Sequence, residues 1–289
     1  MLSYQGLPPL DIRDGLMRAW WFDPLTATVS FGAFINLYWY HERKRGLSSQ
    51  PEFTETVSLG FGPLFNSATA YWLGIFIWKL LVPPAAPYIP DGIPYNATEL
   101  AYLAAEVTTG IFLYDALFFA VHWAMHESPI LRQFHARHHD RRPAAAPTAA
   151  AAAAPSVPAA ARTLESRDTL RHGLLDGSLQ VLINILVQRQ NPWGCKSRAA
   201  RALHNIIVIW MLVESHTSSP APYIWRRWCV GVREHPLHHL GVLKQGTYRY
   251  GKHHRHQQFF GYLDNLRAWW NERQWRIVGV RVQKKKRQE

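Results

Sequence analysis

The sequence predicts an all-α protein: an integral membrane helical bundle of about three or four transmembrane helices, with a re-entrant or interfacial hairpin and a cytosolic, histidine-rich cap. Long apolar runs with few charges predict the helices. The 13 Trp, 12 Tyr and 13 Phe residues are typical of a chain that crosses the boundary between lipid and water, where amphipathic aromatic side chains gather. The 15 His residues cluster at helical spacings and predict the cap.

Charge and cysteine content exclude several classes of protein. The 289 residues carry a net charge of +12, which favours an anionic partner such as nucleic acid or a membrane surface. The apolar runs favour the membrane, so we expect no nucleic-acid partner. Cys195 and Cys229 are the only cysteines, which excludes a disulfide framework and an all-cysteine metal site. The N-terminal segment 1–23 contains acidic residues and no apolar core, so no cleavable signal peptide is expected.

Three apolar runs are the candidate membrane spans. Residues 24–40 carry no formal charge but are at the short end for a span. Residues 58–82 contain a single lysine near their end and form a more convincing span. The third run, 107–125, contains Asp115 and His122. Ionisable groups at such depth are costly, which makes both residues functional candidates.

The loops predict the orientation of these spans. Residues 41–57 contain Arg43, Lys44 and Arg45, whereas residues 83–97 contain no lysine or arginine. The positive-inside rule places the first loop in the cytosol and the second loop outside it. Asn96 begins a glycosylation sequon, which is consistent with a lumenal second loop. The third span then ends at the cytosolic surface.

The remaining segments have distinct compositions. Residues 178–188 and 203–213 are apolar but short, and a basic connection joins them, so we expect a re-entrant or interfacial hairpin. Residues 143–161 are alanines interrupted by prolines, which predicts a disordered cytosolic loop without chemistry. The basic tail, 284–289, predicts contact with anionic lipid and loosely resembles a retrieval signal. Both interpretations favour the endoplasmic reticulum or a related internal membrane.

Eight of the histidines form three boxes. At the observed His frequency, an HxxHH pattern is expected about 0.04 times by chance, yet it occurs twice. Spacings of three and four residues bring side chains to one face of a helix, so each box is expected to aim its imidazoles at a common point. The boxes are HxxxH at His122 and His126, HxxHH at His135, His138 and His139, and HxxHH at His235, His238 and His239.

Eight imidazoles are too many for one ion. A catalytic zinc needs three protein ligands and a structural zinc four, so two adjacent ions with about four imidazoles each are the natural count. The histidine-rich cap is therefore predicted to be a di-metal cap. Imidazole suits iron as well as zinc, and iron with open positions can activate dioxygen. Hydrolysis by two zinc ions remains an alternative, although it usually recruits bridging carboxylates and the boxes contain none.

The order of these boxes on a basic membrane protein resembles the fatty acid hydroxylase and sterol desaturase superfamily of membrane non-haem di-iron oxygenases. The resemblance extends over about residues 114–266 and includes four further elements. Trp123, where relatives usually have arginine, and residues 245–251, which replace an expected Asn-Tyr-Gly, depart from the pattern and leave the subfamily open. The four elements are Asp115 before the first box, His172 followed by an acid, His216 before the last box, and the closing aromatic segment with Asp264.

The resemblance implies the activity and its cofactors. Residues 24–126 would be transmembrane helices that end in the first box, and residues 127–289 a hydroxylase-like catalytic region. Two Fe ions, or Zn in a purified preparation, would be held by the eight box histidines together with His172 and His216. Asp115 would orient a ligating imidazole or make a helix-packing hydrogen bond, and Asp264 would support the ligands. O2 would be activated with electrons from NAD(P)H through a reductase and cytochrome b5.

The implied reaction is hydroxylation or desaturation of a hydrophobic substrate taken from the membrane lipid. Sterols, fatty acyl chains, sphingoid bases and lipophilic secondary metabolites fit the sequence equally. Two alternatives remain: a redox-neutral or hydrolytic di-metal lipid enzyme on the same scaffold, and a non-catalytic metal-binding membrane protein. His253, His254 and His256 are predicted to form a solvated or headgroup-contacting turn, although one of them could be a further ligand. His204, in an apolar stretch, is predicted to be a satisfied core histidine.

Overall fold

The described part of the chain is helical throughout. The computed structural model describes residues 19–45, 74, 76–78, 80–81, 93–139, 164–170, 174–189, 195–217, 224–243 and 256–270, and these residues contain no strand. Residues 262–270 are also helical. The predicted all-α class is confirmed for these ranges. The elements in chain order are α2 (Phe22–Lys44), α4 (Ala97–Glu127), α5 (Pro129–His139), the 3-10 helix η1 (Ser166–Leu170), α6 (Leu174–Arg189), α7 (Arg198–Ser215), α8 (Trp225–Trp228) and α9 (Val230–Leu243).

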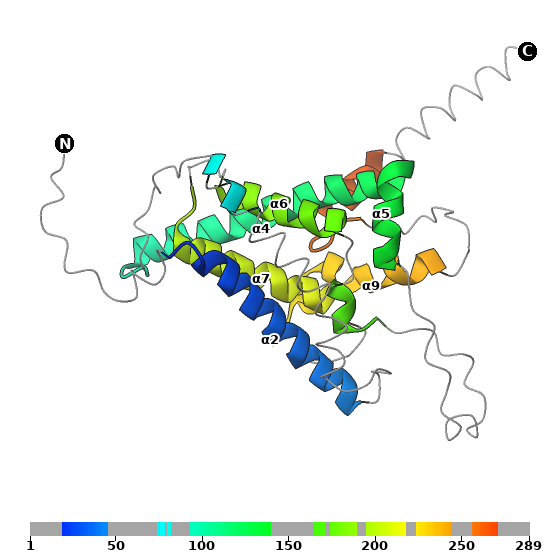
Figure 1. Ribbon diagram of the computed structural model, residues 1–289, viewed down its shortest axis with the longest axis horizontal. Helices are drawn as coiled ribbons and strands as arrows, with labels where there is room; N and C mark the ends of the chain where they lie inside the picture. The colour runs from blue at the N-terminus through cyan, green and yellow to red at the C-terminus, as the bar shows by residue number, and fades with distance from the viewer. Residues whose placement is uncertain are drawn as a thin grey trace, which may run out of the picture.

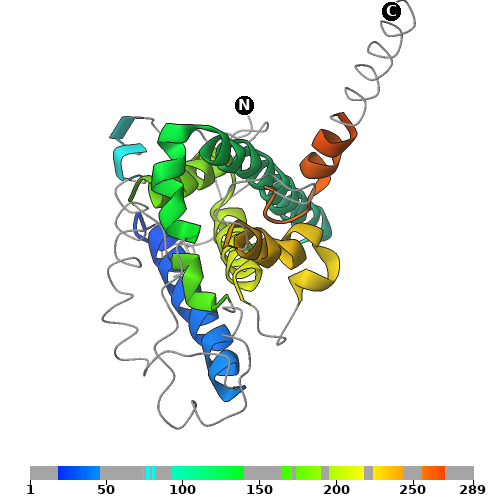
Figure 2. The same cartoon turned by 90° about the vertical axis from the view of Figure 1, so that its right-hand side faces the viewer.

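The long helices pack side by side, and the short ones close one end of the bundle. Helix α7 lies along α2 and also contacts α4, while α6 packs on α4 (Figure 1). Helix α5 packs on α4, and α9 packs on α7 and α8. Figure 2 shows α5 and α9 on the side of the molecule that faces the viewer. The C-terminal ends of α4 and α7 meet these two helices.

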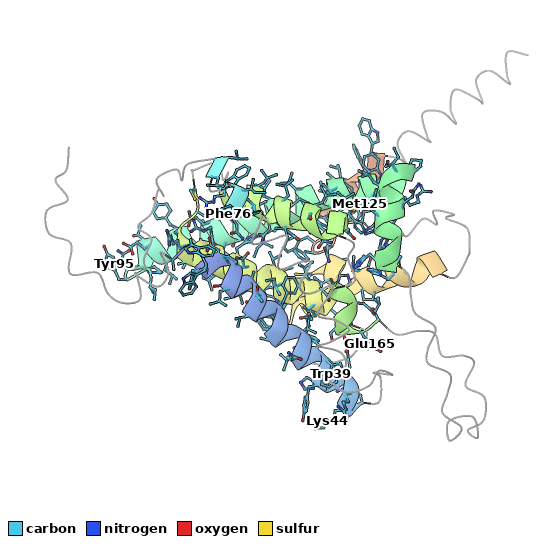
Figure 3. The ribbon with its side chains drawn as sticks, in the orientation of Figure 1. Trp39, Lys44, Phe76, Tyr95, Met125 and Glu165 are labelled. Carbon is cyan, nitrogen blue, oxygen red and sulfur yellow. The ribbon has the colours of Figure 1, made fainter. Side chains whose placement is uncertain are left out.

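Helix α4 begins with a capping box. The Asn96 side chain accepts a hydrogen bond from the Glu99 backbone N–H at 2.8 Å, and the Glu99 carboxylate accepts from the Tyr95 N–H at 3.2 Å. The first bond satisfies one orphan N–H group of the first turn, and the second ties the residue before the N-cap to the helix. Asn96, interpreted above as a sequon residue, is thus the N-cap of the helix. Figure 3 labels Tyr95 at this end of α4 and Met125 at the opposite end, beside α5.

Two apolar clusters hold the bundle together. One joins Tyr114 and Phe118 of α4 to Phe259 in the segment before the last helix, with rings stacked at centroid distances of 6.0 and 5.8 Å from Tyr114. The other joins α2 to α7 through Ile35 and Val213, among others. These contacts fix the C-terminal end of α4 relative to the segments that surround it.

Among the described residues, only α4 is long and apolar enough to cross a membrane. It contains the predicted span 107–125, while the predicted span 24–40 lies in α2. On α2, the Thr26, Thr28, Ser30 and Asn36 side chains hydrogen-bond to the carbonyl four residues before them, at 2.6–2.9 Å. These polar residues lower the hydropathy of α2, although the backbone satisfies their hydrogen bonds.

Only some of the other predicted membrane segments lie within the described residues. Most of 58–82 lies outside the described residues, as do the N-terminal segment up to residue 18, the insert 143–161 and the tail 284–289. A bundle of three or four spans therefore stays a prediction. The two halves of the predicted hairpin are the helices α6 and α7, which have 16 and 18 residues rather than about 11 because polar residues extend each apolar run.

Candidate metal centre

Nine histidines meet where α4, α5, α7 and α9 converge. His122 and His126 lie in the last two turns of α4, and His216 directly follows α7. The remaining six lie on α5 and α9. All nine side chains are at most 6% exposed. Solvent therefore has almost no access to these imidazoles.

The nine imidazoles divide into two groups. Within each group, one ring nitrogen from every member lies within 4.8 Å of the others. Each group is a candidate site for one metal ion, which agrees with the prediction of two ions. The five-histidine group contains His122, His126, His135, His139 and His238, and the four-histidine group contains His138, His216, His235 and His239.

The division corrects one prediction, because neither HxxHH box aims at a single point. His135 and His139 belong to the five-histidine group, but His138 belongs to the other group. On α9 the roles are reversed: His235 and His239 are in the four-histidine group and His238 is not. At about 100° per residue, positions i and i+4 point about 40° apart, whereas i+3 points about 60° to the other side. Each box thus serves both sites.

The nitrogen spacings match metal coordination. Ligand nitrogens about 2.0–2.1 Å from an ion lie about 2.9–3.4 Å apart at coordination angles of about 90–109°. In the five-histidine group the Nε2–Nε2 distances are 3.2 Å for His122–His126, 3.0 Å for His135–His139 and 3.1 Å for His126–His238. In the four-histidine group the three such distances are 3.0–3.3 Å. Both groups are therefore already at ligand spacing.

Hydrogen bonds at Nδ1 set the tautomer of three members. His122 Nδ1 donates to the His256 carbonyl at 2.8 Å, and His216 Nδ1 donates to the Leu212 carbonyl at 2.7 Å. His135 Nδ1 is 3.2 Å from the Asp176 carboxylate. A proton on Nδ1 leaves the Nε2 lone pair free for a metal, and the partner fixes the ring orientation. These contacts are the second layer that metal-ligating histidines require.

The two predicted supporting aspartates both bind the segment 256–260, and Asp264 also lies 3.9 Å from the His256 imidazole. Asp115 accepts hydrogen bonds from the Phe259 N–H at 2.9 Å, the Phe260 N–H at 3.1 Å and the Gln257 side chain at 2.6 Å. Asp264 accepts from the His256 and Gln257 N–H groups at 3.0 and 2.8 Å. Together they hold residues 256–260 so that the His256 carbonyl reaches His122.

A glycine lets this segment approach α9 closely. The Gly231 N–H donates to the Phe259 carbonyl at 2.8 Å. A Cβ atom at Gly231 would lie only 2.6–2.7 Å from backbone atoms of Gln258 and Phe259. No side chain fits at that distance, so the contact requires glycine.

The predictions for the histidines outside the three boxes compare differently with the structure. The prediction of a solvated turn is wrong for His256, whose side chain is 1% exposed, because the buried Asp115 and Asp264 carboxylates draw its segment into the protein. His253 and His254 lie outside the described residues, as does His172, so their predicted roles stay predictions. His204 is fully buried, as expected for a core histidine, and its Nε2 lies 3.1 Å from the Asn184 side-chain oxygen. Its buried Nδ1 has no hydrogen-bond partner among the described residues, so the prediction of a satisfied histidine is confirmed only for Nε2.

Two buried carboxylates near the site were missed in the sequence, whereas Asp176 was noted as the acid that follows His172. The two are Glu42, which accepts from the Ser166 N–H at 2.9 Å and from the Thr217 hydroxyl, and Glu214, which accepts from the Tyr38 hydroxyl at 2.8 Å. Both hold the chain around His216. Positions 42 and 214 each hold an acid at the end of an apolar run. This pattern is the sequence signal that could have identified the two carboxylates.

The two groups could hold cations through neutral nitrogen donors. Burial lowers the pKa of His235, His238 and His239 well below the usual value, so these imidazoles are neutral and available as ligands at neutral pH. Neither group contains a carboxylate or a thiolate. Burial raises the pKa of the nearby Cys229 to about 11, which keeps that thiol protonated and unsuited to binding metal. Imidazole alone suits iron and zinc.

Comparison with known proteins adds no assignment. No family model, no characterised protein and no solved structure matches the chain.

Proposed function

We propose that this protein is a membrane-bound non-haem di-iron oxygenase that hydroxylates or desaturates a hydrophobic substrate with O2. The observation that carries the proposal is the pair of adjacent, buried groups of five and four imidazoles at ligand spacing. Iron in these groups would supply dioxygen activation and oxidation of an unactivated C–H bond. Its electrons would come from NAD(P)H through cytochrome b5 and a reductase.

The donor set favours this chemistry over hydrolysis. Two-metal hydrolases commonly bridge their ions with carboxylates, whereas both groups here consist of histidine alone. An iron ion takes about six ligands, so groups of five and four leave open positions for small molecules. The Asp176 carboxylate bonds to the Nδ1 side of His135 and thus orients a ligand instead of bridging two ions.

The chain's own residues position the ligands and exclude water. His122 and His135 are held by a carbonyl and a carboxylate, and His216 by the last turn of its own helix. Burial of all nine rings limits side reactions of the oxidant with solvent. These are the contributions that a protein makes when a cofactor carries the reaction.

A membrane location supports the choice of a hydrophobic substrate. Large apolar side chains lie exposed along α2 and α4, including Val29, Leu37, Phe112 and Leu117. Such surface is unusual for a soluble monomer and is suited to lipid. With the cytosolic end of α4 at its C-terminus, the metal centre would lie at the membrane surface, where a lipid-like molecule can enter sideways. The basic loops and tail fit an endoplasmic reticulum membrane with the histidines in the cytosol.

The proposal is tested by measuring metal content together with oxygen consumption. Protein is purified from membranes under anaerobic, reducing conditions, its iron and zinc are counted, and O2 uptake is followed with a lipid extract. We expect about two irons per chain and uptake that depends on the extract. Two zinc ions without uptake after iron reconstitution would refute the oxygenase.

Single-ligand variants connect that activity to the two groups. His138→Ala and His238→Ala each remove one ligand, from the four- and the five-histidine group respectively. Both variants are expected to insert into membranes and to lose turnover. His41→Ala, a histidine of α2 outside both groups, is the matched control and should retain activity.

A further inference from the structure

His256 lines the metal centre without belonging to either group of ligands. Its side chain is 1% exposed, and its ring centroid lies 5.1 Å from that of His126, 5.6 Å from His238 and 5.8 Å from His122. All three neighbours are members of the five-histidine group. The His256 side chain thus has a position beside a metal site that the ligand set does not account for.

The hydrogen bond at Nδ1 determines which ring nitrogen of His256 carries the proton. The Arg267 Nη1 atom is 3.2 Å from His256 Nδ1. A guanidinium group only donates, so Nδ1 accepts, and a neutral ring must then carry its proton on Nε2. The Asp264 carboxylate is 3.9 Å from Nδ1, beyond hydrogen-bond distance, and accepts from the His256 backbone N–H instead. His256 is therefore an N–H donor at Nε2.

This tautomer is the opposite of that in the ligands whose tautomer is fixed. His122, His135 and His216 bear the proton on Nδ1 and present the Nε2 lone pair to the metal. His256 keeps its proton on Nε2, which makes it a poor metal ligand and a good hydrogen-bond donor. The two kinds of histidine are thus chemically distinct, although both are buried in the same site.

Arg267 is itself held in place. Its guanidinium lies 5.3 Å from the ring centroid of Trp123 and 3.4 Å from the Glu127 carboxylate, both at the end of α4. A cation–π contact and an ion pair together restrict a flexible side chain. The tautomer of His256 is consequently fixed by the fold.

We propose that His256 donates a hydrogen bond from Nε2 to a small anion that binds the metal of the five-histidine group. A fixed N–H group in a buried site stabilises negative charge without reorganisation, and a bond to an anion is stronger than one between neutral groups. The inference rests on the proposed function only in requiring a metal in that group. It assigns to His256 a role in binding small anions, separate from metal binding.

The test measures azide affinity of the cobalt(II)-loaded protein by its visible absorption, together with cobalt content. The variants are His256→Leu, which removes the donor, His256→Gln, which keeps an N–H donor, and His41→Leu as the control. We expect two cobalt ions in every protein and azide binding about three- to tenfold weaker in His256→Leu. The Gln variant should bind azide within about twofold of the wild type, and the control should equal it.

The outcomes separate this inference from the proposed function. One cobalt ion in His256→Leu would show that His256 is a ligand and overturn the inference. Two cobalt ions with unchanged azide affinity would also overturn it, while leaving the di-metal site intact. No cobalt in the wild type would overturn both.

Arg267→Met, which removes the donor to Nδ1 and keeps a long side chain, provides a second route to the same answer. This variant keeps His256 in the chain and changes a side chain that is one-third exposed, so it is useful if His256→Leu does not fold. Without the guanidinium, the proton is no longer confined to Nε2. Azide binding should then weaken by about two- to threefold with both cobalt ions retained, and an unchanged affinity would contradict the argument from the tautomer.

Discussion

Replacing Asp115 by asparagine tests whether its carboxylate fastens residues 256–260 to α4. The carboxylate accepts three hydrogen bonds, two from backbone N–H groups and one from a side-chain amide. An asparagine keeps one oxygen, so at least the Phe259 or the Phe260 N–H loses its acceptor. An unsatisfied buried donor costs about 1–3 kcal/mol, and the bonds that remain lose their charge assistance. We therefore expect a loss of about 3 kcal/mol in the free energy of unfolding.

The assay is thermal unfolding of detergent-solubilised protein with a thiol-reactive dye. Cys195 and Cys229 are free and at most 5% exposed, so they react only when the fold opens. For a chain of 289 residues, a loss of about 3 kcal/mol lowers the Tm by about 5 °C. Glu127→Gln, a more exposed carboxylate on the same helix with one arginine partner, is the control and should shift the Tm by less than about 2 °C. Equal Tm values for Asp115→Asn and the wild type would refute the reasoning.

Four further predictions follow from the same contacts. Gly231→Ala, which forces a Cβ into the Phe259 backbone, should cost about 1–3 kcal/mol by thermal unfolding, whereas Gly32→Ala, with nothing within 4 Å, should not. Asp176→Asn should weaken binding of one metal ion by about 10- to 100-fold in a chelator competition, and equal affinity would exclude its supporting role. Burial raises the pKa of Glu42 from 4.5 to about 7, so its stabilising contribution, full below pH 4.5, is lost as the pH rises to about 7. The free energy of unfolding, measured by tryptophan fluorescence, should decrease between about pH 4.5 and 7 in the wild type. It should not show this decrease in Glu42→Gln. Removing the metal with a chelator should lower the Tm, and no change would show that the folded site binds no metal.

The helices and most of the histidines that converge could be predicted from the sequence, because local spacing determines both. An HxxxH or HxxHH box places its imidazoles on neighbouring faces of one helix whatever the rest of the fold does. His216 stands alone in the sequence, and only the resemblance to a known family marked it. Its position in the four-histidine group depends on α7 packing between α2 and α4.

The polar character of α2 and the burial of His256 were harder to predict, because each depends on long-range contacts. Residues 24–40 lack charges, yet the α2 helix that contains them is polar along part of its length and buries Glu42 at its end. The sequence around His256 is rich in basic residues, which predicts a solvated turn. The structure buries it because Asp115, about 140 positions earlier, binds the residues that follow His256. No local pattern encodes such a pairing.

The angular division of the HxxHH boxes makes α5 and α9 each contribute histidines to both groups. Helix α5 gives two histidines to the five-histidine group and His138 to the other, and α9 gives two to the four-histidine group and His238 to the first. Neither helix can shift without moving ligands of both sites. Because i and i+4 point about 40° apart and i+3 points about 60° to the other side of i, a helix that lies between two groups of ligands can contribute an HxxHH box to both. Two metal sites built in this way are mechanically coupled, so loss of the single crossing ligand, His138 or His238, should weaken metal binding in both groups.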